Sequence, residues 1–335
     1  HFGTGFFNEM LQYLYGNLAL SIDVFFILSS FLLTWLGINE YKAKGDFSFI
    51  NYFIRRALRI WPLYIFLMIF SFVLVPFVAG YYKVPVTLPP AYYYLFFISN
   101  FYLDGHVYFL RFLWTLSVEE QFYLVWGLCL LLFQKNLSAC AILLAIVSVA
   151  YTVYAMQHNL DGYYNTLIYL FDFAVGILAA VMLHKGNALI GFFKKMNRVG
   201  DFLFILLLPV LFLLMFSLAY FLPHSIAGWL AVVMRYLFVT YTGLFILYQM
   251  VNENAILKLG RLRFLVYTGK ISYGLYCFHG IVLTLGFFLL KKYDFVGYPF
   301  LGVLVMLAAT YFTASMSYRF IEVPFLKIKT KLRRV

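Results

Sequence analysis

Charged side chains are scarce in this sequence. Only 11% of its 335 residues are Asp, Glu, Lys or Arg, whereas 64% are hydrophobic. A soluble domain has about 25% charged residues, because it needs them to cover its surface. A water-soluble fold is therefore excluded. A lipid bilayer, in which the outer face of every helix can be apolar, is the expected environment.

Other features are also lacking. The three cysteines, Cys129, Cys140 and Cys277, lie in or beside apolar segments, so no disulfide framework is expected. The sequence contains no metal-ligand spacing, no glycine-rich phosphate loop and no Gly-x-Ser-x-Gly elbow, so neither a metal nor a permanently bound cofactor is expected. No repeat or linker divides the chain. We therefore predict one transmembrane domain, residues 1–335, with a basic cytosolic tail near 322–335.

The apolar runs predict an all-α bundle of transmembrane helices. The hydrocarbon core of a bilayer is about 30 Å thick and needs roughly 20 apolar residues of helix. Nine segments meet this requirement: 18–37, 60–79, 112–133, 139–156, 164–183, 202–222, 229–250, 271–290 and 298–320. The segment 91–103 is too short to span and is predicted to be interfacial or re-entrant.

The basic residues predict the orientation. Twenty of the 25 Lys and Arg lie in the connecting segments 38–59, 134–138, 184–200 and 251–270 and in the tail 319–335. The positive-inside rule places these segments in the cytosol, so the net charge of +12 reflects topology and predicts no nucleic-acid partner. Residues 1–17 then lie outside, and we expect a further helix before His1.

Ionisable residues inside spans are costly, so each is a functional candidate. Glu119 and Glu120 are adjacent and point about 100° apart on a helix, so one of them should face the protein interior. The alternative is a polar pair that only packs helices. Asp23 could instead cap or orient a helix, His279 could be a satisfied buried group, and for Asp172 we favour that interpretation.

Three arginines, Arg55, Arg56 and Arg59, lie just before Trp61-Pro62 at the predicted cytosolic end of a span. Arg56 and Arg59 share one helix face at a spacing of three residues. Two guanidinium groups on one face can hold a phosphate or pyrophosphate through bidentate hydrogen bonds. Contact with anionic lipid, or a purely topological role, is the alternative.

Five segments together resemble, in the same order, the motifs of the integral-membrane acyltransferase 3 family. They are Ser21–Leu32 (SIDVFFILSSFL), Arg56–Tyr64 (RALRIWPLY), Trp114–Tyr123 (WTLSVEEQFY), Ile271–His279 (ISYGLYCFH) and Ile321–Phe325 (IEVPF). The family has about ten spans, which agrees with nine spans and one preceding helix. The resemblance implies a bacterial inner (cytoplasmic) membrane as the location. Ser30 stands where the family usually has glycine.

The resemblance implies roles for individual residues. His1 falls at the position of the family's catalytic histidine, and Glu119 is its expected acidic partner, within hydrogen-bond reach or one water apart. Arg56 and Arg59, with Arg55, would bind the phosphates of acyl-CoA, whose pantetheine arm threads the bundle. The residues expected to line the acceptor pocket are Asp23, Asn100, Trp114, Glu120, Tyr123, Tyr273 and His279.

The implied activity is transfer of an acyl group, acetyl by family habit, from cytosolic acyl-CoA to a hydroxyl of an envelope glycan or glycolipid. A neutral histidine paired with a carboxylate can remove the hydroxyl proton, and transfer proceeds directly or through an acyl-histidine. One alternative is a proton-coupled secondary transporter with a relay of Glu119, Asp172 and His279, although no repeat supports it. A membrane scaffold is the third alternative. The oligomeric state stays open.

Overall fold

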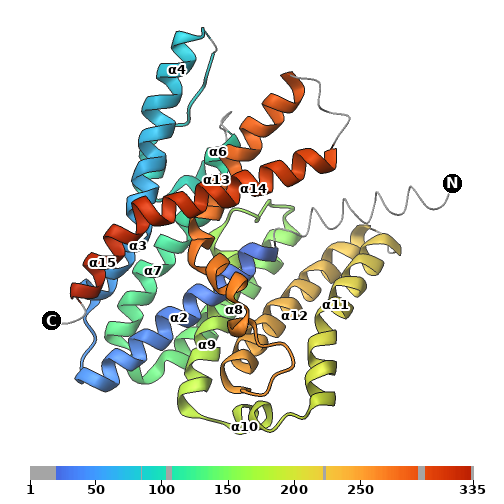
Figure 1. The fold of residues 1–335 in the computed structure, drawn as a ribbon. Coiled ribbons are helices and arrows are strands. Elements are labelled where there is room, and N and C mark those ends of the chain that lie inside the picture. Colours follow the sequence, from blue (N-terminus) through green and yellow to red (C-terminus); the bar gives the residue numbers. More distant parts are fainter. Residues whose placement is uncertain (1–19, 84, 103–107, 222–223, 293–298, 333–335) are drawn as a thin grey trace. The chain divides into compact units, whose positions relative to one another are not determined.

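A computed structural model describes residues 20–83, 85–102, 108–221, 224–292 and 299–332. Within these ranges the regular elements are all helices, and no strand occurs. Figure 1 shows the helices coloured along the chain. The predicted all-α class is therefore confirmed.

Seven helical segments of the described residues are long and apolar enough to cross a membrane: Leu20–Lys44, Phe49–Tyr81, Trp114–Leu132, Gln134–Gln157, Thr166–Lys185, Gly228–Val251 and Leu301–Ile328. An eighth is added if α10 (Ala188–Lys194) and the start of α11 (Arg198–Phe221), which meet at 108°, form one broken span. The predicted span 271–290 falls within α13 (Arg263–Lys292), which is not among these helices. The protein is an integral membrane protein.

Some spans are single helices, and others combine consecutive helical segments. The spans comprise α2 (Leu20–Lys44), α3 (Phe49–Ile69) continued by the π-helical turn η1 (Phe70–Leu74) and α4 (Val75–Tyr81), α7 (Trp114–Leu132), η3 (Gln134–Asn136) with α8 (Leu137–Gln157), α9 (Thr166–Lys185), α12 (His224–Val251), and α14 (Pro299–Ser317) continued by the π-helical turn η6 (Tyr318–Glu322) and α15 (Val323–Leu332). Short elements are α5 (Ala91–Leu95), η2 (Ser99–Phe101), α6 (Tyr108–Arg111) and η4 (Leu259–Arg261). With only five residues, α5 is too short to span a bilayer, as predicted for 91–103.

Two compact units make up the chain. The first comprises His1–Phe47 and Cys129–Leu259, and the second comprises Ser48–Leu128 and Gly260–Val335. The prediction of a single transmembrane domain stays a prediction.

Close contact between α2 and α9 organises the first unit. A Cβ atom at Gly176 of α9 would lie 2.1 Å from Ser30 Oγ and 2.2 Å from the carbonyl oxygen of Ile27, both in α2. Small residues let membrane helices approach this closely, and dispersion contacts then replace the hydrophobic effect that lipid does not supply. Ser30 is fully buried and donates its own hydrogen bond to Ile27 O, at 3.1 Å.

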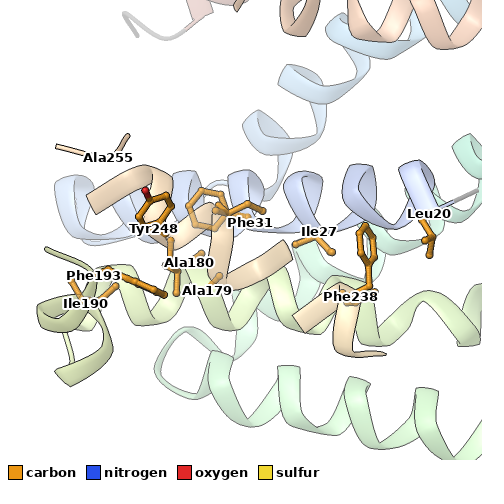
Figure 2. Close-up of a cluster of buried hydrophobic side chains, with 13 residues drawn as sticks. Leu20, Ile27, Phe31, Ala179, Ala180, Ile190, Phe193, Phe238, Tyr248 and Ala255 are labelled. Carbon is orange, nitrogen blue, oxygen red and sulfur yellow. The ribbon is translucent and has the colours of Figure 1, made fainter. Parts of the chain in front are cut away.

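Beside this contact lies the apolar core of the first unit. Figure 2 shows Ile27 and Phe31 of α2 above Ala179 and Ala180 of α9, with Tyr248 of α12 nearby. Phe193 of α10 belongs to the same core. The short helix α10 is therefore held to the bundle through its buried side chains.

In the second unit, hydroxyl groups tie the helices together. Tyr273 of α13 donates to Ile60 O of α3 at 2.9 Å, and Tyr52 of α3 donates to Tyr123 O of α7 at 3.1 Å. Gly274 lets α13 approach α14, because a Cβ there would lie 3.2 Å from the Cα of Ala314. These contacts fix α3, α7 and α13 around one buried region.

Candidate functional site

The second unit contains a cluster of buried charges. Glu119 and Glu120 of α7 are 1% and 7% exposed, and Glu322 of η6 is 4% exposed. Every residue from Leu113 to Glu120 is buried, so both adjacent carboxylates lie inside the protein although they point in different directions. The sequence predicted only that one of them would face inward.

Two arginines of α3 supply the opposite charge. The guanidinium of Arg56 lies 4.8 Å from the ring centre of Tyr123 and interacts electrostatically with Glu120. Arg59 interacts electrostatically with Glu119 and Glu322, and is repelled by Arg56. Within the described residues neither guanidinium forms an ion pair at contact distance. Their hydrogen-bond donors are therefore available to a bound anion, which would also relieve their mutual repulsion.

Hydrogen bonds do not satisfy every oxygen atom of the buried carboxylates. Glu120 lies beside the indole ring of Trp61, yet its Oε1 atom and the Trp61 Nε1 atom form no hydrogen bond of normal geometry in the described part of the chain. The same holds for Oε1 of Glu322. Buried polar atoms of this kind are costly and mark a region that a ligand or water can complete.

Polar side chains of α7 hold the segment 97–100 in place. Gln121 donates from Nε2 to Phe97 O and to Asn100 Oδ1, both at 2.9 Å. The hydroxyl of Ser117 accepts from the Ser99 backbone N–H at 3.2 Å. Asn100 is thus buried against α7, with its amide orientation fixed by Gln121.

His279 lies near the start of α7, with its ring centre 4.5 Å from that of Phe112 and its Nδ1 in contact with Tyr276 O. Tyr276 bonds to Phe112 O and to the Thr115 hydroxyl. Polar groups of α13 therefore surround the first turn of α7, where Trp114 is also buried.

An apolar groove of about 800 Å³ lies beyond the end of α3, along η1 and α4. Its walls come from Phe70, Leu74 and Val78 on one side and from Ile281, Leu285 and Phe288 of α13 on the other. It begins 11 residues, or about 16 Å of helix, beyond Arg59. Its lining contains no charged residue, so it is not the place of the charged chemistry.

The candidate residues fall into three groups. The second unit brings together Glu119, Glu120, Arg56, Arg59 and Tyr123, and it also contains the candidates Arg55, Asn100, Trp114, Tyr273 and His279. Tyr273 uses its hydroxyl to hold α3. His1 lies outside the described residues, so its pairing with Glu119 stays a prediction.

Asp23 belongs to the first unit, where it forms an ion pair with Arg235 of α12. Asp172, for which a satisfied buried role was favoured, bonds to the same arginine. Sequence reasoning missed this triad, and it included Glu322 only as part of the segment Ile321–Phe325. The closing Glu-x-Pro-Phe motif was the signal that pointed to Glu322.

Comparison with known proteins matches most of the chain to one family. The family model Acyl_transf_3, described as an acyltransferase domain, matches residues 2–316. The chain is 26% identical over 330 residues to YrhL of Bacillus subtilis (strain 168), provisionally named a peptidoglycan O-acetyltransferase, covering 91% of this chain and 50% of that protein. It is 26% identical over 345 residues to the peptidoglycan O-acetyltransferase OatA of Listeria monocytogenes, covering 92% and 51%.

A third relative is SACOL0978 of Staphylococcus aureus (strain COL), provisionally named an O-acetyltransferase. It is 28% identical over 337 residues, covering 94% of this chain and 54% of that protein. The chain thus spans about half the length of these curated relatives. No solved structure matches it.

Proposed function

Because the chain belongs to the acyltransferase 3 family and is an acyltransferase, we propose that it transfers an acetyl group from cytosolic acetyl-CoA to a hydroxyl of an envelope glycan or glycolipid. The observation that carries the proposal is the buried cluster of Glu119, Glu120, Arg56 and Arg59 within the matched region. The names of the relatives favour acetyl as the group and a peptidoglycan-type glycan as the acceptor.

The donor is bound by Arg56 and Arg59. Two repelling guanidinium groups on one helix face, both without an ion pair in the described part of the chain, favour a bridging anion. The phosphates of coenzyme A supply that anion. The guanidinium of Arg56 also lies over the ring of Tyr123, and this contact restricts the positions that the side chain can take.

Acceptor activation falls to His1 and Glu119. The resemblance gives the role of general base to His1, and Glu119 would orient the ring and stabilise the imidazolium that forms as the hydroxyl proton is taken. The acceptor oxygen then attacks the thioester carbonyl, and the thiolate of coenzyme A leaves. Glu119 is suited to this role because it is a buried carboxyl group that interacts electrostatically with Arg59.

Transfer by the purified protein tests the proposal. The full chain in detergent would be given acetyl-CoA labelled in the acetyl group and a soluble peptidoglycan fragment as acceptor. Label in an ester of the fragment is the expected result. Proton-driven solute uptake in proteoliposomes, with neither transfer nor thioester hydrolysis, would instead support the transporter alternative.

Replacement of Arg59 tests donor binding. Arg59→Ala is expected to raise the KM for acetyl-CoA by roughly tenfold or more, because a hydrogen bond to a charged group contributes about 1.5–3 kcal/mol. Arg59→Lys should restore little, since an ammonium cannot make the bidentate contact. Lys44→Ala is the matched control, because Lys44 is an exposed cation on the same predicted cytosolic side. An unchanged KM for acetyl-CoA in both variants would mean that Arg59 serves only to set the orientation of the helix in the membrane.

The proposed orientation places the C-terminal tail in the cytosol. In a variant without native cysteines, Thr330→Cys should resist a membrane-impermeant thiol reagent added to intact cells, whereas Asp161→Cys should react. The reason is the concentration of basic residues in the segments that include 319–335. Labelling of position 330 by reagent added outside the cell would place the tail on the outer side and reverse the proposed orientation.

A further inference from the structure

The first unit holds a second buried charge cluster, which takes no part in the proposed donor site. Nη2 of Arg235 (α12) donates to Asp23 Oδ1 (α2) at 2.9 Å and to Asp172 Oδ2 (α9) at 2.5 Å. Both carboxylates therefore converge on a single nitrogen atom. Three helices far apart in sequence meet at this triad.

Burial makes the triad costly in an ionised state. The side chains of Asp23 and Asp172 are 4% and 0% exposed, and that of Arg235 is 19% exposed. Oδ1 of Asp172 has no hydrogen-bond partner among the described residues. A charged oxygen without a donor in such a place carries a large desolvation penalty.

The charges of the triad do not balance. Two carboxylates and one guanidinium leave one excess negative charge if both acids are ionised. Besides the two acids, the titratable side chains that lie against Arg235 in the described part are those of Tyr169 and Tyr236, and Tyr169 Oη in turn donates to Tyr163 O. None of them brings a positive charge. Two carboxylates that share one site do not readily both ionise.

We propose that the triad is a proton-binding site in which Asp23 and Asp172 share one proton taken from solvent. Both carboxyl groups contact the same Arg235 nitrogen, so a charge on one disfavours ionisation of the other. One neutral acid, one carboxylate and one guanidinium then sum to zero charge. This neutral set is what allows α2, α9 and α12 to pack inside hydrocarbon.

Linkage gives the sign of the pH dependence. Carboxyl groups exposed in the unfolded chain are ionised near neutral pH. The folded state then holds one more proton than the unfolded state, so stability falls as pH rises. For one proton, the ratio of folded to unfolded protein decreases up to about tenfold per pH unit.

Infrared spectroscopy of the full chain in detergent detects the proton directly, because a protonated carboxyl has a carbonyl band that a carboxylate lacks. At neutral pH we expect one component of this band to disappear in Asp23→Asn and also in Asp172→Asn, since the remaining acid is then ionised by Arg235. Glu120→Gln, which removes a buried acid of the second unit, should leave that component in place. A component that persists in both Asn variants would overturn the proposal.

Stability provides an independent readout. As pH rises above the ordinary carboxyl range, wild-type protein in mixed micelles should become easier to unfold, whereas Asp172→Asn should lose this slope, because an amide resembles the protonated acid. A wild-type slope retained in Asp172→Asn, or a stability that depends on sodium concentration and not on pH, would contradict proton binding. Neither measurement needs substrate, so the inference stands apart from the proposed catalytic function.

Discussion

Replacing Glu119 with Gln is expected to remove most of the acetyl transfer while leaving acetyl-CoA binding intact. The amide keeps the size of the side chain but cannot stabilise an imidazolium, and general base catalysis contributes about 10²- to 10⁴-fold to rate. The transfer rate should therefore fall by a factor in this range, and the Kd of acetyl-CoA, measured by calorimetry, should change little. Glu253→Gln, at an exposed position, serves as the control.

A double variant distinguishes catalysis from a general electrostatic effect. If His1 and Glu119 act as a unit, His1→Ala combined with Glu119→Gln should be little worse than either single variant. Losses that multiply would separate the two residues. A His1→Ala protein with near-normal transfer would remove His1 from the reaction altogether. A Glu119→Gln protein that no longer binds acetyl-CoA would assign this carboxylate to the donor site.

A leucine at Gly176 is expected to prevent the first unit from folding. Its Cβ alone would lie 2.2 Å from the carbonyl oxygen of Ile27, a backbone atom that cannot rotate away. Overpacking costs about 1–3 kcal/mol of folding stability when the neighbouring side chains can adjust. This contact cannot adjust unless α2 separates from α9, so the cost here should be larger. Size-exclusion chromatography of detergent extracts should show loss of the monodisperse protein.

Matched substitutions locate the cause of that loss. Ser30→Gly removes the nearby hydroxyl but leaves Ile27 O in place, so it should not rescue Gly176→Leu. Gly191→Ala is the control within the same unit, because a Cβ there meets no atom within 4 Å. It should be tolerated. Normal folding of Gly176→Leu would mean that α2 and α9 can separate by the width of a side chain.

Apolar length was sufficient to predict where most helices lie, because a bilayer imposes one requirement on every span. The triad of Asp23, Asp172 and Arg235 could not be predicted in this way. Its members lie 63 to 212 residues apart, and their pairing depends on which faces of α2, α9 and α12 meet. Uniformly apolar helices give little information about their faces, so the sequence identified Asp23 and Asp172 singly but did not pair them with Arg235.

The candidate site shows the same limit. The adjacent pair Glu119 and Glu120 was recognisable because intramembrane carboxylates are rare. Glu322 was not recognised as a member of the cluster, because ordinary helical spacing does not apply to its segment. Asn100 was assigned to the pocket by resemblance, and its bond to Gln121 depends on a non-helical segment with a positive φ of 53° at Phe97.

Because of the π-helical turn η6, the direction of Glu322 depends on how many residues the turn contains, and not only on which residues they are. In this turn the backbone N–H of Val323 donates to Tyr318 O, five residues back. If the same residues were wound as an ordinary α-helix, Glu322 and α15 would be rotated by about 100° relative to α14. A scan of point substitutions through Tyr318–Ile321 would find no side chain responsible for the direction of Glu322. The direction of this carboxylate is sensitive to insertions and deletions. Two relatives can therefore share every residue of this motif and still differ in whether Glu322 lies near Arg59.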